Sequence, residues 1–429
     1  MKVCVFGLWH LGCVTAACLA ELGFNVTGLD FDQANIADLR MGKAPLSEPG
    51  LDDLIKEGLK SGRLSFSSEA SAALNGIDAL WVTFDTPVNE NDVADPGFIE
   101  NMLMSIAPKL KSGVKIIISS QVPAGFTKKL KAAINKMDPG RELFFAYSPE
   151  NLRLGKAIKV FLEPDRIIIG SLPDEKALFT PLFSAISSRL EWMSIESAEM
   201  TKHAINAFLA ASVSFANEIA VLCESVGADA KDVERGLKTE DRIGPKAYLS
   251  PGVAFSGGTL ARDIVFLSET GNSFDLPLHL IKAVKESNDF HKGWVQRKCL
   301  EIFGGLSGRQ MAVLGLTYKP GTDTLRRSFS VELCCWLNQQ GAVIKAFDPS
   351  IKELPGSLKG VLSIADSIKN AVLGADCMIV ATEWPVFREL DPETIREISG
   401  CVVIDPNGFI EKQLIGCSGI NYVRVGRQK

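Results

Sequence analysis

The sequence predicts an α/β protein in which two doubly wound units with parallel sheets flank a helical middle region. Short apolar segments alternate with helical patterns in residues 1–193 and again in residues 304–429, and this alternation is typical of parallel sheets. Between them, residues 196–224 contain neither Gly nor Pro and repeat apolar side chains at helical spacing. We therefore expect three domains, 1–193, 194–303 and 304–429.

The individual elements follow this division. Glu196 and Glu199 lie in the first turn of the long helix, where its dipole favours acids, and Gly227 stands just beyond its end. Such a helix would span roughly 40 Å. The phrase VFGL at residues 5–8 returns weakly as VLGL at 313–316, after a linker at 304–308. We expect strands at 3–6, 25–29, 79–84, 114–119, 143–147, 166–169, 310–314, 343–347, 377–381 and 402–404, and further helices at 13–22, 231–237, 263–298 and 330–340.

Composition excludes several classes of function. A net charge of -5 over 429 residues argues against a general nucleic-acid binder. The ten Cys are scattered without a Cys-x-x-Cys pair or a His cluster, which indicates neither a metal site nor a redox dithiol. Free thiols suit a reducing cytoplasm, and the sequence shows no signal peptide and no apolar run of about 18 residues. We expect a cytoplasmic protein with no metal, nucleic-acid or membrane partner.

A glycine-rich turn after the first strand predicts a dinucleotide-binding, Rossmann-like N-terminal domain. The segment from Gly7 to Gly12 reads GLWHLG, which matches Gly-x-Gly-x-x-Gly except that Trp9 replaces the middle Gly. In that pattern the first Gly makes the turn, the second lets the backbone approach a pyrophosphate, and the third packs helix on strand. Trp9, His10 and Leu11 would then line the pyrophosphate site.

Asp30 predicts NAD rather than NADP as the cofactor. It follows the second strand, eighteen residues after Gly12, where an acid can accept the ribose hydroxyls and would repel a 2′-phosphate. A strand-terminal turn Asp is the structural alternative, and the strand, turn and helix before it favour the cofactor role.

Further candidate groups are each open to a purely structural interpretation. Lys202 and Asn206 share one helix face and can donate to an oxyanion, or they can be a solvated pair. Residues 251–263 form a Gly-rich loop that can present N–H groups to an anion or simply cap a helix. Lys319 and Arg326 can meet a diphosphate or belong to a charged surface loop. Glu150 lies beyond a strand's carboxyl end, where open sheets bind ligands, or caps a helix.

Taken in order, these motifs resemble the UDP-glucose/GDP-mannose dehydrogenase family, the nucleotide-sugar dehydrogenases, over essentially the whole chain. The motifs that carry the resemblance are the Gly7 turn with Asp30, DTP at 85–87, SSQVP at 119–123, SPENLR at 148–153, KxxxNAFL at 202–209, DRIG at 241–244, the loop 251–263, KPGTD at 319–323 and ATEW at 381–384.

The resemblance implies oxidation of the C6 alcohol of a UDP-glucose-like nucleotide sugar to a carboxylate, with two NAD and a cysteine thioester. It implies a C-terminal Rossmann-like nucleotide-sugar domain, a homodimer or higher homo-oligomer built on the long helix, and a place in polysaccharide biosynthesis. By motif, Lys202 and Asn206 would stabilise the oxyanion, Asp263 would assist a water as base, and Glu150 would act at the thioester. Thr86 and Gln121 would contact the cofactor. The expected substrate contacts are Phe255, Gly257, Lys319, Arg326 and Arg242. The resemblance allows Arg242 to reach the nucleotide sugar from the other subunit of a dimer.

The departures from the family fall on the chemistry. Thr259 stands where the family has its nucleophilic Cys, and Gln121, Leu154 and Trp9 replace a Thr, a Glu and a Gly of its motifs. A hydroxyl is essentially un-ionised at neutral pH without a general base, and no His lies near Thr259 in sequence. A covalent acyl intermediate on Thr259 is therefore not expected.

Three functions remain open on the sequence. The first is an NAD-dependent nucleotide-sugar dehydrogenase, which could stop after one oxidation, oxidise an aldehyde hydrate without a covalent step, or act at another sugar carbon. The second is a catalytically silent nucleotide-sugar binder, suggested by the four altered positions and opposed by the retained Lys202, Asn206, Asp263 and Glu150. The third, a β-hydroxyacid dehydrogenase, leaves the C-terminal unit unexplained and ranks last.

Overall fold

The computed structural model describes residues 1–89, 93–150, 152–255, 258–326, 328–398, 400–414 and 416–427. The chain divides into two compact units, Met1–Ile205 and Asn206–Lys429, and the long helix α9 (Ile195–Val226) begins in the first and continues in the second. The predicted α/β class is confirmed, and so are the parallel sheets and the long helix. The three-domain division at 193 and 303 stays a prediction.

The N-terminal unit is a doubly wound sheet. Among its described residues, eight strands lie in the order β3-β2-β1-β4-β5-β6-β7-β8, and all neighbours are parallel except β6 and β7. The strands are β1 Lys2–Phe6, β2 Asn25–Leu29, β3 Leu64–Ser67, β4 Ala79–Val82, β5 Lys115–Ile118, β6 Phe144–Tyr147, β7 Ile167–Gly170 and β8 Leu190–Met193. The helices are α1 His10–Glu21, α2 Gln33–Arg40, α3 Leu51–Lys60, α4 Ala70–Ala73, α5 Pro96–Ile106, α6 Phe126–Met137, α7 Ala157–Leu162 and α8 Lys176–Ser184.

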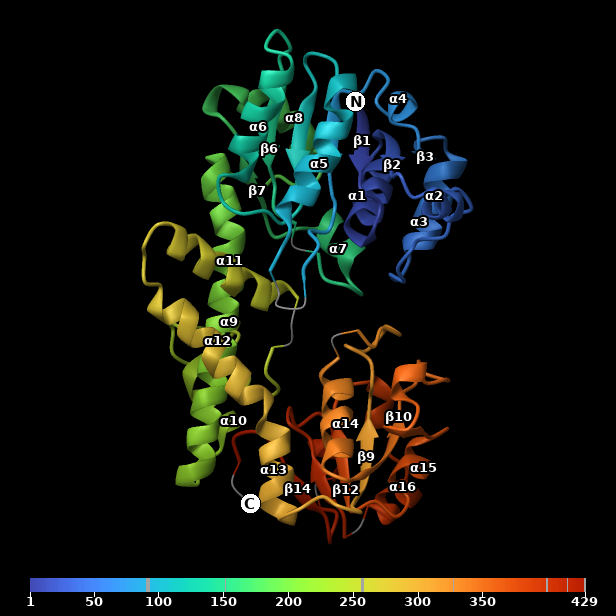
Figure 1. Cartoon of the computed structure of the whole chain (residues 1–429), viewed down its shortest axis with the longest axis vertical. Helices are drawn as coiled ribbons and strands as arrows, with labels where there is room; N and C mark the ends of the chain where they lie inside the picture. Colours follow the sequence, from blue (N-terminus) through green and yellow to red (C-terminus); the bar gives the residue numbers. More distant parts are fainter. Residues whose placement is uncertain are drawn as a thin grey trace. The chain divides into compact units, whose positions relative to one another are not determined.

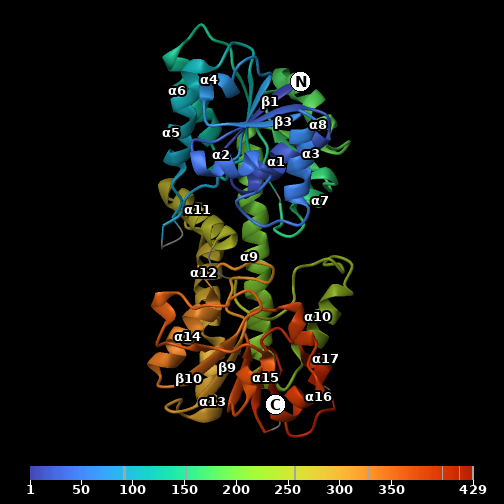
Figure 2. The ribbon, with the colours of Figure 1, turned by 90° about the vertical axis from the view of Figure 1, so that its right-hand side faces the viewer.

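Helices cover both faces of this sheet, so its strands are apolar on both sides. Helices α4, α5 and α6 pack on one face, and α1, α3, α7 and α8 on the other (Figure 2). Successive residues of β1 alternate between the two cores: Cys4 and Phe6 join the first, Val3 and Val5 the second. Near-continuous burial along the strands is what the apolar runs in the sequence require.

The second unit combines helices with a six-stranded parallel sheet in the order β11-β10-β9-β12-β13-β14 among its described residues (Figure 1). Its helices before the sheet are α10 Ala230–Lys238, α11 Thr259–Ser273, α12 His279–Lys292 and α13 Trp294–Phe303. The sheet region contains β9 Gln310–Leu314, α14 Phe329–Gln339, β10 Val343–Phe347, β11 Ser363–Ile364, α15 Ile368–Val372, β12 Cys377–Val380, α16 Pro392–Glu397, β13 Val402–Ile404, α17 Glu411–Leu414 and β14 Asn421–Val423.

The predicted helical stretch 263–298 is three helices rather than one. It begins four residues earlier than expected, at Thr259, and breaks at Asp275, whose φ of 55° is left-handed, and again at Gly293. Pro277 follows the first break and cannot continue the helix. A period-based prediction misses these breaks because apolar spacing resumes after each of them.

Helix α9 combines an apolar composition with buried polar residues. Among the described helices it alone is long and apolar enough to cross a membrane, although core helices of soluble proteins meet the same criterion. The sequence predicts no membrane span because it contains no uninterrupted apolar run of about 18 residues. In α9 the apolar run is interrupted by four buried polar residues, Glu199, Lys202, Asn206 and Asn217. Two of these buried polar side chains belong to the first unit and two to the second.

Candidate active site

The glycine turn between β1 and α1 has the geometry that the sequence predicts. Gly7 has a φ of +99°, and a Cβ there would lie 2.7 Å from the Phe84 ring. A Cβ on Gly12 would lie 1.8 Å from the carbonyl oxygen of Gly7, so the helix could not pack against the turn. Both positions therefore require glycine, for conformation at Gly7 and for close approach at Gly12.

Trp9 takes the middle position without strain. It is the N-cap of α1 with a φ of -91°, a region open to any residue, and its side chain is 48% exposed. The backbone N–H groups of His10, Leu11 and Gly12 follow in the first helical turn, where N–H groups lack intrahelical acceptors and bind phosphate well. The turn thus fits a pyrophosphate even though Trp9 replaces a Gly.

Asp30 lies against this turn at the end of β2. Its Oδ2 accepts the N–H of Leu8 at 2.7 Å, and its Oδ1 accepts the N–H of Asp32 at 3.0 Å. Two carboxylate oxygens offer about four acceptor sites, so capacity remains for a ribose diol. The residues around Gly7, Gly12 and Asp30 therefore fit an NAD cofactor.

Glu48 is a buried residue of this region that sequence reasoning missed. Its Oε2 lies 2.9 Å from Nε2 of His10 and also accepts the N–H of Gly155 at 2.8 Å, while Oε1 accepts the N–H of Ala157 at 2.9 Å. Only 6% of Glu48 is exposed. An isolated acid before a Pro-Gly turn gives no sequence signal of such contacts.

The loop after β5, which carries Gln121, is held between Thr86 and α9. The hydroxyl of Thr86 donates to the Gln121 carbonyl. On the α9 side, Glu199 accepts the N–H of Thr127 at 2.9 Å, and His203 Nε2 lies 2.8 Å from the Val122 carbonyl. Burial raises the pKa of Glu199, and the N–H groups of Thr127 and Gly125 oppose that rise. The structure thus brings together the predicted pair Thr86 and Gln121.

The structure also brings Lys202 to Glu150. Nζ of Lys202 donates to the Glu150 carbonyl at 2.6 Å and lies 3.7 Å from its Oε1. Lys202 is buried, and Glu150 Oε2 accepts the N–H of Leu152 at 2.7 Å. An ammonium has three donors, so Lys202 keeps further donors for a ligand.

In the second unit, Asn206 donates through Nδ2 to Oδ2 of Asp263, and both side chains are buried. Gly258, with a φ of +116°, precedes α11, so Thr259 opens the helix and Asp263 follows one turn later on the same face. Thr259 is exposed. The predicted grouping of Asn206, Asp263 and Thr259 thus has a structural basis in α9 and α11.

Buried amides and an imidazole fix the loop that leads to α11. Asn288 bonds both the N–H and the carbonyl of Phe255 at 2.9 Å, and Asn217 Oδ1 accepts the N–H of Gly252 at 2.9 Å. His291 Nε2 lies 2.8 Å from the Gly252 carbonyl. Burial lowers the pKa of His291. Sequence reasoning missed these three side chains, and the predicted substrate residue Gly257 lies outside the described residues.

The C-terminal sheet repeats the glycine turn of the first unit. Gly315 has a φ of +89°, and Oδ2 of Asp348 accepts the N–H of Leu316 at 2.7 Å, as Asp30 does for Leu8. Here, however, Trp384 Nε1 donates to the same oxygen at 3.2 Å, and Asp348 is buried. The weak repeat in the sequence therefore corresponds to a repeated turn.

Three predicted substrate residues lie in loops of the second unit. Lys319 is half-buried and Arg326 is exposed in the segment between β9 and α14. Arg242 follows α10, its side chain is 88% exposed, and its Nε lies 2.7 Å from Oε1 of Glu240. Their contacts with a substrate stay predictions.

The cysteines of this chain form no disulfides. All ten Cys are free, eight are buried, and Cys335 and Cys417 are half-buried. Among the described residues, no group of three or more His, Cys, Asp or Glu side chains is placed to hold a metal ion. The thiol of the thioester route is thus missing at Thr259.

Comparison with protein families gives three consecutive matches. The models of the UDP-glucose/GDP-mannose dehydrogenase family match with the NAD binding domain at residues 1–187, the central domain at 196–290 and the UDP binding domain at 312–412. The chain belongs to this family. NAD is therefore its cofactor, and the class of enzyme is the NAD-dependent nucleotide-sugar dehydrogenase.

Relatives of this family cover the chain from end to end. The UDP-glucose 6-dehydrogenase of Rhizobium meliloti (strain 1021) is 33% identical over 100% of both chains. The UDP-glucose 6-dehydrogenase TuaD of Bacillus subtilis (strain 168) is 32% identical over 99% of this chain and 93% of its own. The solved structure of a UDP-glucose dehydrogenase from Pyrobaculum islandicum has a TM-score of 0.88 at 30% identity, covering 99% of this chain and 97% of its own.

Proposed function

We propose that this chain oxidises C6 of a UDP-linked, glucose-like sugar by one hydride transfer to NAD and releases the product without forming a thioester. One observation carries the proposal: Asn206 and Asp263 keep a buried hydrogen bond, while Thr259 opens α11 where the thioester route needs a thiol. The relatives named UDP-glucose 6-dehydrogenases and the match to the UDP binding domain support the choice of substrate.

The retained polar groups suit the first oxidation. Oxidation at C6 removes the hydroxyl proton and a hydride. The proton would pass to a water that Asp263 assists as base, and the hydride would pass to NAD. Donors that face the C6 oxygen stabilise the negative charge that develops on it as the proton leaves, and so lower the barrier. Asn206 has two N–H donors, of which Asp263 takes one and fixes the orientation of the other. Lys202, one turn earlier on α9, keeps donors beyond the one given to Glu150. When bound, NAD accepts the hydride.

The second oxidation of the thioester route lacks its nucleophile. A Thr hydroxyl is essentially un-ionised at neutral pH and is a far weaker nucleophile than a thiol. Asp263, one turn later on the same face of α11, is bonded by Asn206 and is the base that we assign to the water of the first oxidation. An aldehyde is therefore expected to leave rather than to be trapped as a covalent adduct.

Single-turnover measurement tests the proposal. With enzyme in excess over UDP-glucose and with NAD present, we expect one NADH per sugar and an aldehyde-level product, which hydroxylamine would convert to an oxime. We expect no protein-bound acyl group, so no uronic hydroxamate should form. Thr259→Ala should keep kcat within about threefold because the hydroxyl is not a nucleophile, whereas Asp263→Asn should lower kcat. Two NADH per sugar with a uronic acid product would overturn the proposal.

Thermal unfolding distinguishes the alternative function, binding of a nucleotide sugar without catalysis. If UDP-glucose and other nucleotide sugars raise the melting temperature while no NADH forms, the chain binds without oxidising. The Thr259→Cys variant then asks whether the rest of the site is intact, because a trappable thioester would form only with working hydride chemistry.

Self-association through α9 is part of the proposal. Phe208, Phe215 and Leu222 lie seven residues apart on α9 and are 72%, 48% and 57% exposed. Such spacing places them on one stripe, and apolar stripes of this kind pair with a second helix. We expect a homodimer by light scattering and a monomer for Phe208→Ser/Phe215→Ser, with Phe274→Ser, an equally exposed site, as control. Cytoplasmic localisation and a role in polysaccharide biosynthesis stay predictions.

A further inference from the structure

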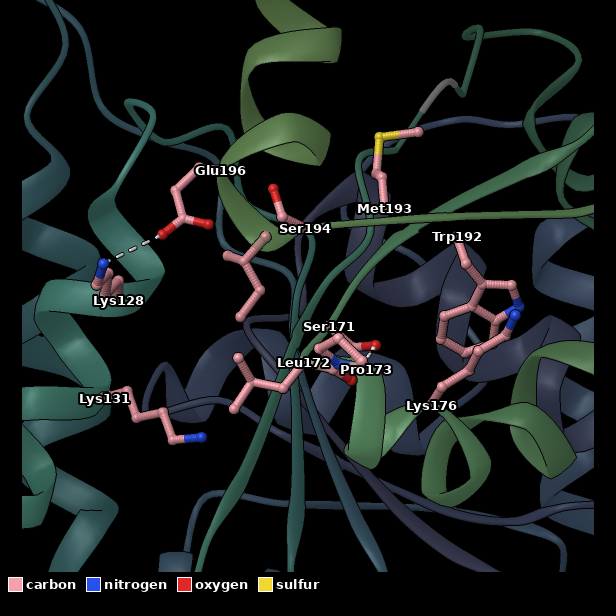
Figure 3. A pocket seen from close by; sticks show the side chains of 11 residues that line it. Lys128, Lys131, Ser171, Leu172, Pro173, Lys176, Trp192, Met193, Ser194 and Glu196 are labelled. Carbon is pink, nitrogen blue, oxygen red and sulfur yellow. Dashed lines mark hydrogen bonds and ion pairs between the residues drawn. The ribbon is translucent and has the colours of Figure 1, made fainter.

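A pocket of about 630 Å³ lies beside β8, the edge strand of the N-terminal sheet (Figure 3). Its wall consists of the ends of β7 and β8, helix α6, and the first residues of α8 and α9. This volume is within the range of small-molecule sites, about 300–1,000 Å³. None of the residues to which a role was given above lines it.

Strand order separates this pocket from the cofactor turn, since β4, β5 and β6 lie between β1 and β7. Strands β1, β4, β5 and β6 run in parallel, so Gly7, Gln121 and Glu150 all lie beyond the carboxyl ends of these strands, at the same end of the sheet. Strand β7 runs antiparallel to β6 and β8 runs parallel to β7, and the last residues of the three strands, Tyr147, Gly170 and Met193, pair with one another. The chain therefore leaves β7 and β8 in the direction opposite to that in which it leaves β6. Ser171 and Ser194, which follow β7 and β8, line the pocket.

The wall of the pocket is apolar and its rim is cationic. Leu172, Trp192, Met193 and Ile195 supply apolar surface. Lys128, Lys131 and Lys176 line the same space with a single carboxylate, Glu196. Figure 3 shows Lys128 and Lys131 on one side of the pocket and Lys176 with Trp192 on the other. The lining therefore carries an excess of positive charge around an apolar surface.

Two of the three lysines already have carboxylate partners. Lys131 lies 2.9 Å from Glu175, and Lys128 lies 3.7 Å from Glu196 in an exposed pair. Lys176 makes no ion pair with the described residues, and its Nζ stands 5.1 Å from the centre of the Trp192 ring. A cation held over an indole at the rim of an apolar pocket is a ready partner for an anion.

We propose that this pocket binds a small amphipathic anion, an aromatic or aliphatic body that carries one phosphate or carboxylate. The apolar body would lie on Leu172, Met193 and Ile195, and the anionic group would pair with Lys176. A purely inorganic anion leaves the apolar wall uncovered, and a neutral apolar molecule leaves Lys176 unpaired. The two features together therefore select the amphipathic class, and this inference is independent of the proposed oxidation.

Calorimetry on the full chain saturated with NAD tests the proposal. We expect 1-naphthyl phosphate to bind with one site per chain, and 1-naphthol and inorganic phosphate to bind at least about tenfold more weakly, since each lacks one half of the interaction. Comparing 1-naphthyl phosphate with 1-naphthoate and octanoate distinguishes phosphate from carboxylate and an aromatic body from an aliphatic one. Absence of binding by all three anions would overturn the proposal.

Variants locate the site. Lys176→Met keeps the side-chain stem and should weaken binding at least about fivefold, whereas Lys136→Met, an exposed lysine of α6 away from the pocket, should leave it unchanged. Equal affinities for Lys176→Met and the unaltered chain would contradict the proposal. If Leu172→Asp changes the molar mass in light scattering, a second copy covers the pocket, and the ligand proposal fails.

Discussion

His10 and Glu48 join the cofactor turn to the segment that follows Glu150. Nε2 of His10, in the first turn of α1, lies 2.9 Å from Oε2 of Glu48, and the same carboxylate accepts N–H groups of Gly155 and Ala157. The Glu48 side chain is 1% exposed. One buried carboxylate thus fixes the expected pyrophosphate site and the start of α7 together.

Replacing Glu48 by Gln should weaken cofactor binding more than turnover. The amide keeps one acceptor oxygen but turns its NH₂ group toward N–H donors, so at least one buried donor loses its partner. We expect the KM for NAD to rise about tenfold, kcat to change less than about threefold, and stability to fall by about 1–3 kcal/mol. Steady-state kinetics and urea unfolding measure both effects. Glu57→Gln, an exposed acid on α3, is the matched control, and equal KM values in the two variants would contradict the positioning role.

Breaking the hydrogen bond between Asn206 and Asp263 should lower kcat. Asn206→Ala removes the donor that we propose for the developing oxyanion, and we expect kcat to fall about 100-fold with a smaller change in KM. Glu269→Gln, on the exposed side of α11, serves as control. A loss confined to KM would show that Asn206 only binds the substrate.

Two glycines of the N-terminal unit distinguish the cost of backbone strain from the cost of a steric clash. Gly7→Ala combines a φ of +99° with a Cβ 2.7 Å from Phe84, while Gly62→Ala has a φ of +71° and nothing within 4 Å. A left-handed non-Gly residue costs about 1–2 kcal/mol, so Gly62→Ala should lose about that much stability and Gly7→Ala clearly more. Denaturant unfolding compares them, and equal losses would show that Phe84 moves aside freely.

His291 should make the stability of the second unit depend on pH. Burial lowers its pKa below the usual 6.5, so the unfolded chain binds the proton more readily. The contribution of His291 is therefore complete above 6.5 and is lost as the pH falls below that value and through the folded-state pKa. As the pH is lowered from 8 to 5, the melting temperature should fall less steeply in His291→Gln, whose amide can still donate to the Gly252 carbonyl, than in the unaltered chain. Identical slopes would remove His291 as the cause.

Periodicity and turn chemistry predict the scaffold of this chain well. The strands 25–29, 310–314, 343–347 and 402–404 have the expected bounds, because each contains apolar residues that the helices on the sheet faces cover. Strand β8 was missed because its residues Leu190–Met193 are only half-buried and include Glu191 at the edge of the sheet.

The sequence predicts those site residues that belong to a recognisable motif. It does not predict isolated side chains that hold a loop in place by bonding its backbone. Asp30, Lys202 and Asp263 stand in recognisable patterns, and the structure gives them as partners Leu8, Glu150 and Asn206, while their roles stay predictions. Glu48 and Asn288 bond backbone groups far away in sequence, over separations of 107 and 33 residues for Gly155 and Phe255. Such contacts depend on tertiary packing and have no local signature.

The burial of the native thiols makes this chain suited to site-selective chemical labelling. Eight of its ten cysteines lie inside the fold, and Cys335 and Cys417 are only partly accessible. A thiol placed at position 259 would instead stand exposed in the first turn of α11, where the helix N-terminus favours the reactive thiolate. The same Thr259→Cys variant that tests the chemistry could therefore carry a maleimide fluorophore, which would report the arrival of a nucleotide sugar by emission rather than by turnover.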